Sequence, residues 1–562
     1  MYSNKENINI LTALLKAYGV THAVVCPGSR NAPIVHNLNE TSGIECHPVT
    51  DERSAGFYAL GMSLAVDGPV AVCVTSGTAL LNLAPAVAEA FYQHVPLVVI
   101  SADRPAQWID QLDGQTLPQP MALGPFVKKA VSLPEPHDDE ERWYCQRLIQ
   151  EALLCYDGPV HINVPVSEPL FEFTVAELPI VRKITSFNAG DSPELINDSV
   201  LGAFFKARRP MVVIGQDNGI AAYIGHLRCY AVVLHESLYA GNQEPVLFDE
   251  VLRKVGDDAA YKPDCVMYIG GTLVSKRLKK FLRASGDATF IRVSADGHLD
   301  DTFQHLDYLV ETIPYLLLRK MNGYCKRGAF RNEDLEKDEP LADTKDFVAL
   351  WHKALRRADE HARAYTPDYS QMLAVKCFEK VLTDKMPDAI VHYANSTAIR
   401  LANIYAHHPV WCCRGVNGIE GSLSTAAGFA AQADTSLRVF CVIGDLSFFY
   451  DANALWNTRL HGNLRILLLN NGGGGVFRML PGLEKSPARG QYVAAEHQAS
   501  AEGICLQNNI VYLKAEDQEQ LKEGVERLVS EESDRPMLLE VLTEAAIDAR
   551  VLKDYYQFNF LK

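Results

Sequence analysis

The sequence predicts an α/β protein built from three doubly wound parallel-sheet domains, of which the first and the third are copies of each other. Strand-like and helix-like segments alternate along most of the chain, which is typical of parallel sheets covered by helices on both faces. The 562 residues are too many for one hydrophobic core. Two of the alternating regions also match each other at a constant offset, which indicates a duplicated domain.

Breaks in the alternation place the domain boundaries. Strand-like runs such as "HAVVCPGS" and "PLVVISADR" mark a first domain, expected at residues 1–182, which the Pro-rich passage "VPVSEPLFEFTVAELP" ends. A second region, with "PMVVIGQDNG" and "CVMYIGGTLVSKRLKKF", is expected at residues 190–345. The charged run "RNEDLEKDEPLADTKD" is expected to be a solvated linker before the third domain, residues 365–562.

A duplication relates the first domain to the third. The segment "VVCPGSRNAP" aligns with "VHYANSTAIR", so that Ser29 matches Ser396 at an offset of 367 residues. The same offset aligns three further pairs without a gap, namely Gly61 with Gly428, Gly77 with Gly444, and Asp103 with Asn470. Spacing and hydrophobic pattern therefore agree over 75 residues.

The overall charge excludes several classes of partner. Lysine and arginine number 53 against 69 acidic residues, and the resulting net charge of −16 repels nucleic acid and anionic membranes. No window offers the roughly 20 apolar residues of a membrane helix, and "MYSNKENINI" lacks the features of a signal peptide. The 13 scattered cysteines are expected to be reduced thiols. We therefore expect a cytoplasmic protein without nucleic-acid partners or membrane insertion.

Two polar side chains follow neighbouring strands of the third domain. Asp445 comes directly after "LRVFCVIG" and Asn471 ends "LRILLLNN", with "YDANALWNTRL" expected as the helix between them. Parallel strands joined by a right-handed crossover end at the same sheet edge, so the two side chains should converge there. Carboxylate and amide oxygens suit Mg²⁺ with phosphate oxygens completing the octahedron. Alternatively, Asp445 stabilises a helix N-terminus and Asn471 is a turn residue.

Four glycines, 472–475, follow this strand. A flexible loop is one explanation, and close approach of a diphosphate to the bare backbone is the other. At the matching edge of the first domain, Glu52 stands where a helix begins, for which capping or stabilisation by the helix dipole is the simple explanation. The duplication pairs Glu52 with Ile419, so that one copy presents an acid and the other a branched apolar residue. No histidine adjoins these motifs in the sequence.

Together the motifs resemble a known family. Gly-Asp followed one strand later by Asn-Asn is similar to the metal motif of thiamine-diphosphate enzymes, which bind their cofactor between two homologous domains. The set "CPGSRNAP", "TDERSAGFYALG", "TSGTALLNLAPAVAEA", "SADRP", "NSTAIR", "RGVNGIEGSLSTAAG" and "GDLSFFYDANAL" narrows the resemblance. Over essentially the whole chain it looks like the menaquinone-biosynthesis family that makes 2-succinyl-5-enolpyruvyl-6-hydroxy-3-cyclohexene-1-carboxylate.

The resemblance implies thiamine diphosphate and Mg²⁺, or Mn²⁺, as cofactors. Glu52 would hydrogen-bond the aminopyrimidine ring and favour the imino form that removes the thiazolium C2 proton, while Ile419 would hold the cofactor bent. The metal ligands implied are Asp445, Asn471 and the Gly473 carbonyl. The other cofactor contacts implied are Gly444, Leu446, Ser447 and Val476.

The implied reaction is decarboxylation of 2-oxoglutarate and Stetter-like conjugate addition of the succinyl semialdehyde carbanion to isochorismate. Both substrates are carboxylic acids, which the planar fork of arginine binds well. The substrate residues implied are Ser29, Arg30, Arg104, Gln115, Lys276, Arg277, Ser396, Arg400, Arg414 and Phe477. The alternatives are surface ion pairs for the arginines, a solvated helix face for "SKRLKKFL", and core packing for Phe477.

The family places each cofactor between the first domain of one chain and the third domain of another, which implies a homodimer or homotetramer with active sites at the subunit interface. Two other functions stay open. One is a thiamine-diphosphate-dependent decarboxylase or carboligase for a different 2-oxo acid. Arg400 and Arg414 argue against it, because they favour dicarboxylate substrates. The other is a non-catalytic metabolite-binding relative, against which Glu52 and Asp445 favour retained chemistry.

Overall fold

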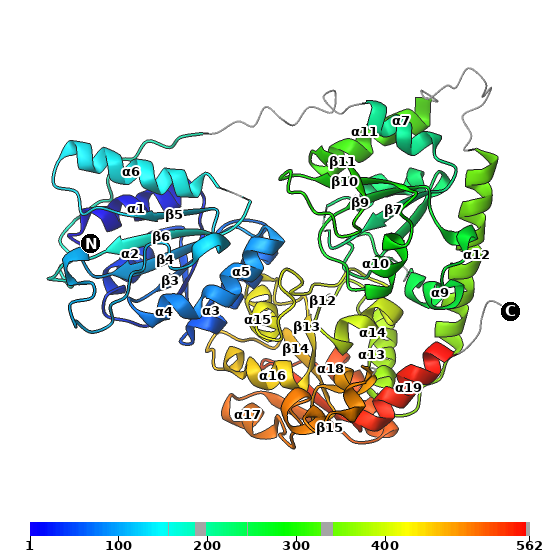
Figure 1. Cartoon of the computed structure of the whole chain (residues 1–562). Helices are drawn as coiled ribbons and strands as arrows, with labels where there is room; N and C mark the ends of the chain where they lie inside the picture. Colours follow the sequence, from blue (N-terminus) through cyan, green and yellow to red (C-terminus); the bar gives the residue numbers. More distant parts are fainter. Residues whose placement is uncertain are drawn as a thin grey trace.

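The computed structural model describes residues 1–155, 157–185, 198–217, 219–243, 246–327, 341–480 and 482–557. Within these ranges the chain forms three parallel sheets flanked by helices, which agrees with the predicted fold class (Figure 1). In Figure 1 the first sheet lies at the left, the second at the upper right, and the third below them. Among the described helices, none has both the length and the apolar character to span a membrane.

The first sheet has six strands in the order β2-β1-β3-β4-β6-β5. Its strands are β1 His22–Val25, β2 Glu45–Pro48, β3 Val70–Val74, β4 Leu97–Asp103, β5 Lys129–Ser132 and β6 Val160–Pro165. Its helices are α1 Glu6–Ala17, α2 Ala32–Glu40, α3 Glu52–Val66, α4 Thr78–Asn82, α5 Ala84–Gln93 and α6 Asp139–Leu153. Strands β3 and β4 are buried along their whole length, as expected when helices cover both faces.

The second sheet has the order β11-β10-β9-β7-β8. Its strands are β7 Pro210–Ile214, β8 Val232–His235, β9 Cys265–Ile269, β10 Thr289–Ser294 and β11 Leu306–Glu311. The helices of this region are α7 Asp198–Lys206, α8 Ala221–Ile224, α9 Phe248–Val255, α10 Lys276–Arg283, α11 Pro314–Arg327 and α12 Ala342–Ala364.

Helix α12 corrects part of the linker prediction. The charged run expected as a linker covers residues 331–346; up to residue 340 it lies outside the described residues, but from Ala342 onward it is helical. The helix is amphipathic, and Phe347, Trp351 and Ala354 are buried on one side of it. Trp351 packs against Tyr261 of the second domain and donates a 3.2 Å hydrogen bond to its carbonyl oxygen. The boundaries at 182, 190, 345 and 365 stay predictions.

The third sheet has the order β12-β13-β14-β16-β15. Its strands are β12 Ile390–Tyr393, β13 Val439–Gly444, β14 Leu464–Asn470, β15 Val511–Ala515 and β16 Met537–Leu542. Its helices are α13 Gln371–Lys385, α14 Thr397–Tyr405, α15 Ser422–Gln432, α16 Asp445–Tyr450, α17 Glu502–Gln507, α18 Gln518–Ser530 and α19 Ala545–Gln557.

The helix expected from "YDANALWNTRL" is wrong in its position. Helix α16 begins at Asp445, directly after the strand, and only a 3-10 turn, Ala452–Leu455, follows it. Asp451 interrupts the helix, because its buried carboxylate accepts hydrogen bonds from the backbone N–H and the hydroxyl of Ser424, at 2.8 and 2.7 Å.

The predicted duplication is visible in the strand order. Without its edge strand β2, the first sheet reads β1-β3-β4-β6-β5, and the third reads β12-β13-β14-β16-β15 in the corresponding order. Strands β4 and β14, Leu97–Asp103 and Leu464–Asn470, begin and end 367 residues apart. The two domains are therefore copies of one topology.

Helices α3 and α15 cross with their backbones in contact and join the first domain to the third (Figure 1). A Cβ at Gly61 would lie 1.9 Å from the carbonyl oxygen of Thr425, and a Cβ at Gly428 would lie 2.0 Å from that of Tyr58. The two contacts are equivalent in the duplication, because the offset of 367 residues pairs Gly61 with Gly428 and Tyr58 with Thr425. The crossing is therefore reciprocal, as in a two-fold interface. Only glycine at both positions permits this approach.

A second contact between these domains is a buried carboxylate. Glu89 of α5 is 3 % exposed and accepts hydrogen bonds from the backbone N–H groups of Gly415 and Val416, at 2.7 and 2.6 Å. Burial raises the pKa of Glu89, and the two backbone donors oppose that shift by stabilising its ionised form. The loop that follows Arg414 is thereby fixed by the first domain.

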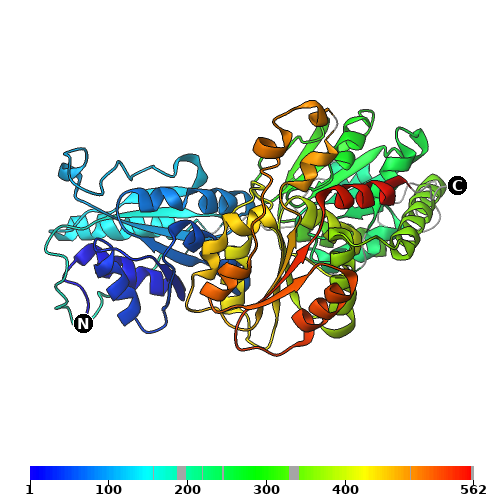
Figure 2. The ribbon, with the colours of Figure 1, turned by 90° about the horizontal axis from the view of Figure 1, so that it is seen from below.

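The second and third domains meet through α19, whose position beside α9 and α12 is seen in Figure 1 and, from below, in Figure 2. Tyr555 of α19 donates a 3.0 Å hydrogen bond from its hydroxyl to Glu250 of α9, and its carbonyl oxygen lies 2.9 Å from His361 Nε2. Glu250 is 4 % exposed, and burial, with the adjacent Asp249, raises its pKa to about 7.

We expect Gly61→Ala and Gly428→Ala each to lower the free energy of unfolding by about 1–3 kcal/mol, because the added methyl group meets a backbone oxygen of the facing helix. Urea unfolding followed by circular dichroism measures this change. Gly503→Ala in α17 is the matched control, since its Cβ would meet nothing within 4 Å, and it should be neutral or slightly stabilising. A Gly61→Ala protein as stable as the wild type would contradict the close crossing.

Glu250 should make stability depend on pH. Its pKa is about 7 when folded against a reference of 4.5, so the folded state holds the proton longer and stability falls as pH rises through that window. Glu250→Gln lacks this proton and should gain stability relative to the wild type between pH 5 and pH 8, by up to about 3 kcal/mol. Urea unfolding at both pH values, with the exposed Glu523→Gln as control, tests this. An equal difference at both pH values would refute it.

Candidate active site

Strands β13 and β14 end side by side and bring Asp445 and Asn471 together, as the predicted topology requires. The Asp445 carboxylate accepts hydrogen bonds from the backbone N–H groups of Asn471 and Gly473, at 3.1 and 2.9 Å, and from that of Leu446, at 2.7 Å. Asp445 is 4 % exposed. Burial raises its pKa, while the N–H donors counteract that shift.

The four glycines form a held loop rather than a flexible one. Gly472 and Gly473 have φ angles of 77° and 150°, a region that other residues rarely adopt. A Cβ at Gly472 would lie 2.9 Å from the carbonyl oxygen of His497, and one at Gly473 would lie 2.9 Å from that of Ala494. Bare backbone is therefore required because residues 494–497 pack directly on the loop.

His497 lies beside these motifs in space, although no histidine adjoins them in the sequence. Its Nε2 lies 3.6 Å from Asp445 Oδ2 and is buried. Its Nδ1 accepts a 3.1 Å hydrogen bond from the backbone N–H of Ala499, so the neutral ring carries its proton on Nε2, facing Asp445. The ring also contacts Phe449 of α16 edge-on, with centroids 5.3 Å apart.

The chemistry of the oxygen atoms at this edge fits a hard divalent cation. The Asn471 amide donates through Nδ2 to Asp548 at 2.8 Å, and its Oδ1 accepts no hydrogen bond from any residue that the structure describes. The Gly473 carbonyl accepts one hydrogen bond, from Gly475 N–H at 2.9 Å, and keeps a second lone pair. With the Asp445 carboxylate these atoms make the oxygen-only set that Mg²⁺ or Mn²⁺ prefers.

The remaining predicted cofactor positions surround this edge. Gly444 ends β13 and has nothing within 4 Å of a Cβ position, whereas Ser447 of α16 is buried. Val476 and Phe477 lie in the 3-10 turn Gly475–Met479, and the Phe477 ring lies against Gly474, 2.6 Å from where a Cβ would be.

Another cluster of potential metal ligands lies in the first sheet, near the amino ends of its strands and not at the carboxyl ends that the predicted site residues follow. His22, Glu45 and His47, at the starts of β1 and β2, bring one ligand atom each within 4.8 Å of one another. His22 Nδ1 and His47 Nε2 are 3.3 Å apart, and Glu45 forms a 2.6 Å ion pair with Arg459. A mutual hydrogen bond between two neutral imidazoles and a surface ion pair account for this cluster without a metal.

Glu52 is the first residue of α3, but it does not cap the helix. Asp51 is the N-cap, and its side chain accepts hydrogen bonds from the backbone N–H groups of Arg53 and Ser54. The Glu52 carboxylate makes no hydrogen bond or ion pair with any described residue. Ile419, its duplicate position, is 44 % exposed. Capping therefore does not explain Glu52, whereas stabilisation by the helix dipole agrees with its place in the first turn of α3. The Glu52 carboxylate and the Ile419 side chain stay available for other contacts.

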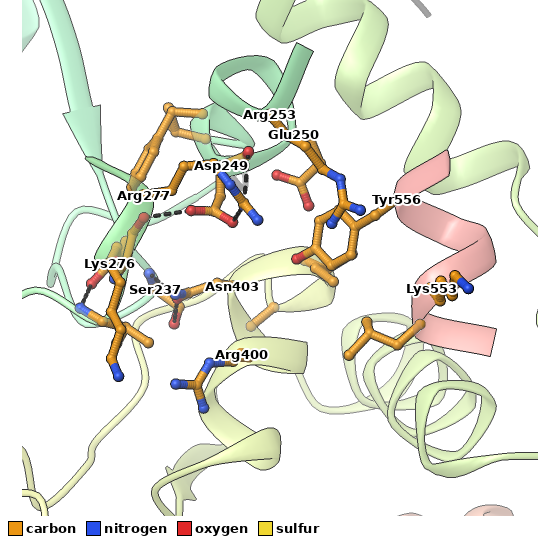
Figure 3. Close-up of a pocket in the computed structure, with 18 of the residues that line it drawn as sticks. Ser237, Asp249, Glu250, Arg253, Lys276, Arg277, Arg400, Asn403, Lys553 and Tyr556 are labelled. Carbon is orange, nitrogen blue, oxygen red and sulfur yellow. Dashed lines mark hydrogen bonds and ion pairs between the residues drawn. The ribbon is translucent and has the colours of Figure 1, made fainter. Parts of the chain in front are cut away.

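A cavity of about 960 Å³ lies between the second and third domains (Figure 3). Among the predicted substrate residues it is lined by Lys276, Arg277 and Arg400. Arg478, which directly follows Phe477, also lines it. Because Arg478 belongs to the turn after the glycines, the cavity and the predicted metal site share one short segment of chain.

Two acids fix the cationic segment at the start of α10. Glu236 is 4 % exposed and accepts hydrogen bonds from the backbone N–H groups of Val274 and Ser275, at 2.6 and 2.7 Å. Arg277 forms an ion pair with Asp249, and its guanidinium lies 5.7 Å from the centre of the Tyr556 ring (Figure 3). Burial raises the pKa of Glu236 to about 7.

Arg400 and Arg414 lie close enough to repel each other. Burial lowers the pKa of Arg400, and the charge of Arg414 lowers it further. Arg400 donates to the carbonyl oxygen of Ser396 at 2.7 Å, and Ser396 has a positive φ of 71°. Arg414 donates to Asn395 Oδ1 at 3.0 Å, and its buried Nε has no partner among the described residues. Two cations are thus held together with unfilled hydrogen-bonding capacity.

The predicted substrate residues of the first domain lie at their own sheet edge. Arg30 pairs with Glu168 at 3.2 Å, and Arg104 pairs with Asp113 at 2.8 Å. Ser29 is exposed, and Gln115 lies against Gly77, whose Cβ position is 3.3 Å from its backbone. None of these four predicted residues lines the cavity. One chain therefore brings Lys276, Arg277 and Arg400 together at the cavity, whereas the predicted substrate residues of the first domain, and Ser396, Arg414 and Phe477 of the third, do not line it.

Sequence reasoning missed several residues that support this site, namely Glu89, Glu236, Asp249, His497 and Asp548. Each acts through a contact with a segment far away in the sequence, and apart from Glu89, which stands in "TSGTALLNLAPAVAEA", none belongs to the quoted motifs. The one available signal was local: Glu236 directly follows the buried strand β8, where an acid needs buried donors.

Two family models match the chain. The model described as "Thiamine pyrophosphate enzyme, N-terminal TPP binding domain" matches residues 8–123, and that described as "Thiamine pyrophosphate enzyme, C-terminal TPP binding domain" matches residues 395–541. The first match contains Glu52, and the second contains Asp445 and Asn471. The two matched domains are also the two copies of the duplication.

Curated relatives match over nearly the full length. The 2-succinyl-5-enolpyruvyl-6-hydroxy-3-cyclohexene-1-carboxylate synthase of Bacteroides thetaiotaomicron is 44 % identical, with 99 % of each chain covered. The proteins of the same name from Bacteroides fragilis and Porphyromonas gingivalis are 45 % and 36 % identical, over 99 % of this chain and 99 % and 98 % of theirs. The chain therefore belongs to the 2-succinyl-5-enolpyruvyl-6-hydroxy-3-cyclohexene-1-carboxylate synthase family of thiamine pyrophosphate enzymes.

Proposed function

We propose that the protein uses thiamine diphosphate and a divalent cation to decarboxylate 2-oxoglutarate and to add the remaining four-carbon unit to isochorismate. The products are 2-succinyl-5-enolpyruvyl-6-hydroxy-3-cyclohexene-1-carboxylate and CO₂. The observation that carries the proposal is the cationic cavity, which shares the segment after the four glycines with the oxygen atoms at the ends of β13 and β14. Family membership supplies the reaction class.

In this proposal the chain holds the cofactor and orients it. When bound, thiamine diphosphate supplies the nucleophilic carbon and delocalises the charge left by CO₂ loss. Asp445, Asn471 and the Gly473 carbonyl would bind the cation that anchors the diphosphate, and the glycines allow the tight loop that presents this carbonyl. Glu52 would accept a hydrogen bond from the pyrimidine ring and favour one tautomer, and Ile419 would hold the cofactor bent.

The cavity cations bind the carboxylates of both substrates. Arg277 is held in place by Asp249, and Arg400 has a neighbouring cation in Arg414, so an incoming carboxylate relieves like-charge repulsion. Each charge-assisted hydrogen bond to a carboxylate contributes about 1.5–3 kcal/mol. Dicarboxylates gain from several such contacts at once, whereas a simple 2-oxo monoacid does not.

A second copy of the chain completes the site in this proposal. Glu52, Ser29, Arg30, Arg104 and Gln115 belong to the first domain and do not line the cavity of their own chain. A two-fold arrangement of two chains would present the first-domain edge of one chain to the third-domain edge of the other. The protein is then a homo-oligomer with two chains contributing to each site.

The first test follows isochorismate absorbance and CO₂ release with protein, thiamine diphosphate, Mg²⁺ and 2-oxoglutarate, and with each component left out. We expect consumption only when all are present. Arg400→Ala should bind thiamine diphosphate like the wild type but lose about 10- to 100-fold in kcat/KM, the equivalent of one charge-assisted hydrogen bond. CO₂ release at an unchanged rate without isochorismate would instead indicate a plain decarboxylase, and no reaction despite cofactor binding would reject isochorismate as substrate.

Subunit mixing tests the shared site. Glu52→Gln and Asp445→Asn chains should each be inactive alone, but mixed dimers contain one site in which both residues are wild type. After subunit exchange we expect about a quarter of wild-type activity. The double variant mixed with inactive Glu52→Gln chains is the control and should recover nothing. If mixed dimers form, as native mass spectrometry reports, without any recovered activity, the cofactor is held within one chain.

A further inference from the structure

Asp548, in the first turn of α19, makes a hydrogen bond that decides which way the Asn471 amide points. Asn471 Nδ2 donates to Asp548 Oδ2 at 2.8 Å. The amide has one donor side and one acceptor side, and an ionised carboxylate can only accept. The side facing Asp548 is therefore the NH₂ group, and the amide oxygen is directed away from it.

The Asp548 carboxylate is itself fixed from two further directions. Its Oδ1 accepts a hydrogen bond from the backbone N–H of Gln371 at the start of α13, at 2.8 Å. Its Oδ2 accepts a second hydrogen bond from the Thr543 hydroxyl, at 2.8 Å, just beyond β16. With three donors around it, the carboxylate cannot rotate without losing a contact, so it is a rigid reference for the amide.

We propose that Asp548 is a positioning residue of the metal centre, which holds the Asn471 side chain so that Oδ1, and not the NH₂ group, faces the cation. This rests on the proposed function, in which Asn471 is a metal ligand. Without Asp548 the amide could turn over and present a hydrogen-bond donor to a cation, which repels it. Residues that orient a metal ligand in this way typically contribute 10- to 100-fold to metal affinity.

The same helix, α19, also contacts the substrate cavity. Tyr555, seven residues further on, lies on the same face of α19 as Asp548 and donates to Glu250 of α9. Tyr556 places its ring 4.9 Å from the Arg253 guanidinium and 5.7 Å from that of Arg277. Helix α19 is thus anchored at the predicted metal ligand by its first turn and at the cavity by its last.

A double-mutant cycle separates orientation from mere support of the fold. In the full-length oligomer, Mg²⁺ affinity is measured by calorimetry in saturating thiamine diphosphate for the wild type, Asp548→Asn, Asn471→Asp and the double variant. Asp548→Asn should weaken Mg²⁺ binding about 10- to 100-fold in the Asn471 background. In the Asn471→Asp background both oxygens at position 471 are equivalent, so the same change should weaken binding little or even strengthen it by removing a like charge.

The outcomes distinguish the possibilities. Equal losses in both backgrounds would mean that Asp548 only supports the fold, and wild-type affinity in Asp548→Asn would also overturn the proposal. If Asn471→Ala leaves Mg²⁺ affinity unchanged, Asn471 is no ligand and the proposed metal site itself fails. Glu544→Gln, an exposed acid just before α19, is the charge control and should leave affinity unchanged. Thermal unfolding without ligand checks each fold, and Asp548→Ser is the substitute should Asp548→Asn not fold.

Discussion

The crossing of α3 and α15 is the constraint on which the arrangement of the site depends. Glu52 opens α3, and Ile419 stands three residues before α15, so the crossing fixes where one chain presents each residue, and in the proposed oligomer each of the two contributes to a different site. Backbone contact at Gly61 and Gly428 leaves no room for one helix to slide on the other. The relative position of the two duplicated domains is therefore set by a glycine pair that takes no part in chemistry itself.

The parts of the structure that follow from local pattern and topology rules could be predicted from the sequence. The alternation of strand-like and helix-like segments predicted three parallel sheets. The constant offset of 367 residues predicted the shared strand order, and β4 and β14 begin and end at matching positions. The meeting of Asp445 with the segment at Asn471 needs only the rule that parallel neighbours end at one edge. Such features are repeated along the chain or are imposed by chirality, and a single sequence displays them.

What the sequence could not predict depends on packing between distant segments. The start of helix α12 was predicted as a linker because the run is highly charged. Its apolar face is recognised only from its packing against Tyr261. His497 lies beside Asp445 because residues 494–497 pack back on the glycine loop. No hydrophobic periodicity in the sequence predicts this packing. Asn471 and Asp548 are likewise 77 residues apart. The contacts of His497 and Asp548 lie beside the proposed metal ligands, where the chain departs from regular patterns.

The charge balance of the cavity is consistent with binding of the anionic substrates proposed above, although the protein has a net charge of −16. Seven lysine and arginine side chains line it against four acids, and two of those acids, Glu236 and Glu250, have pKa values raised to about 7. Near neutral pH these two are partly protonated, so the described lining carries an excess of positive charge. In a low-dielectric cleft that excess is focused rather than screened. Burial therefore does more than hold Glu236 in place, because by raising its pKa it also weakens the compensation of the Arg400 and Arg414 charges near neutral pH.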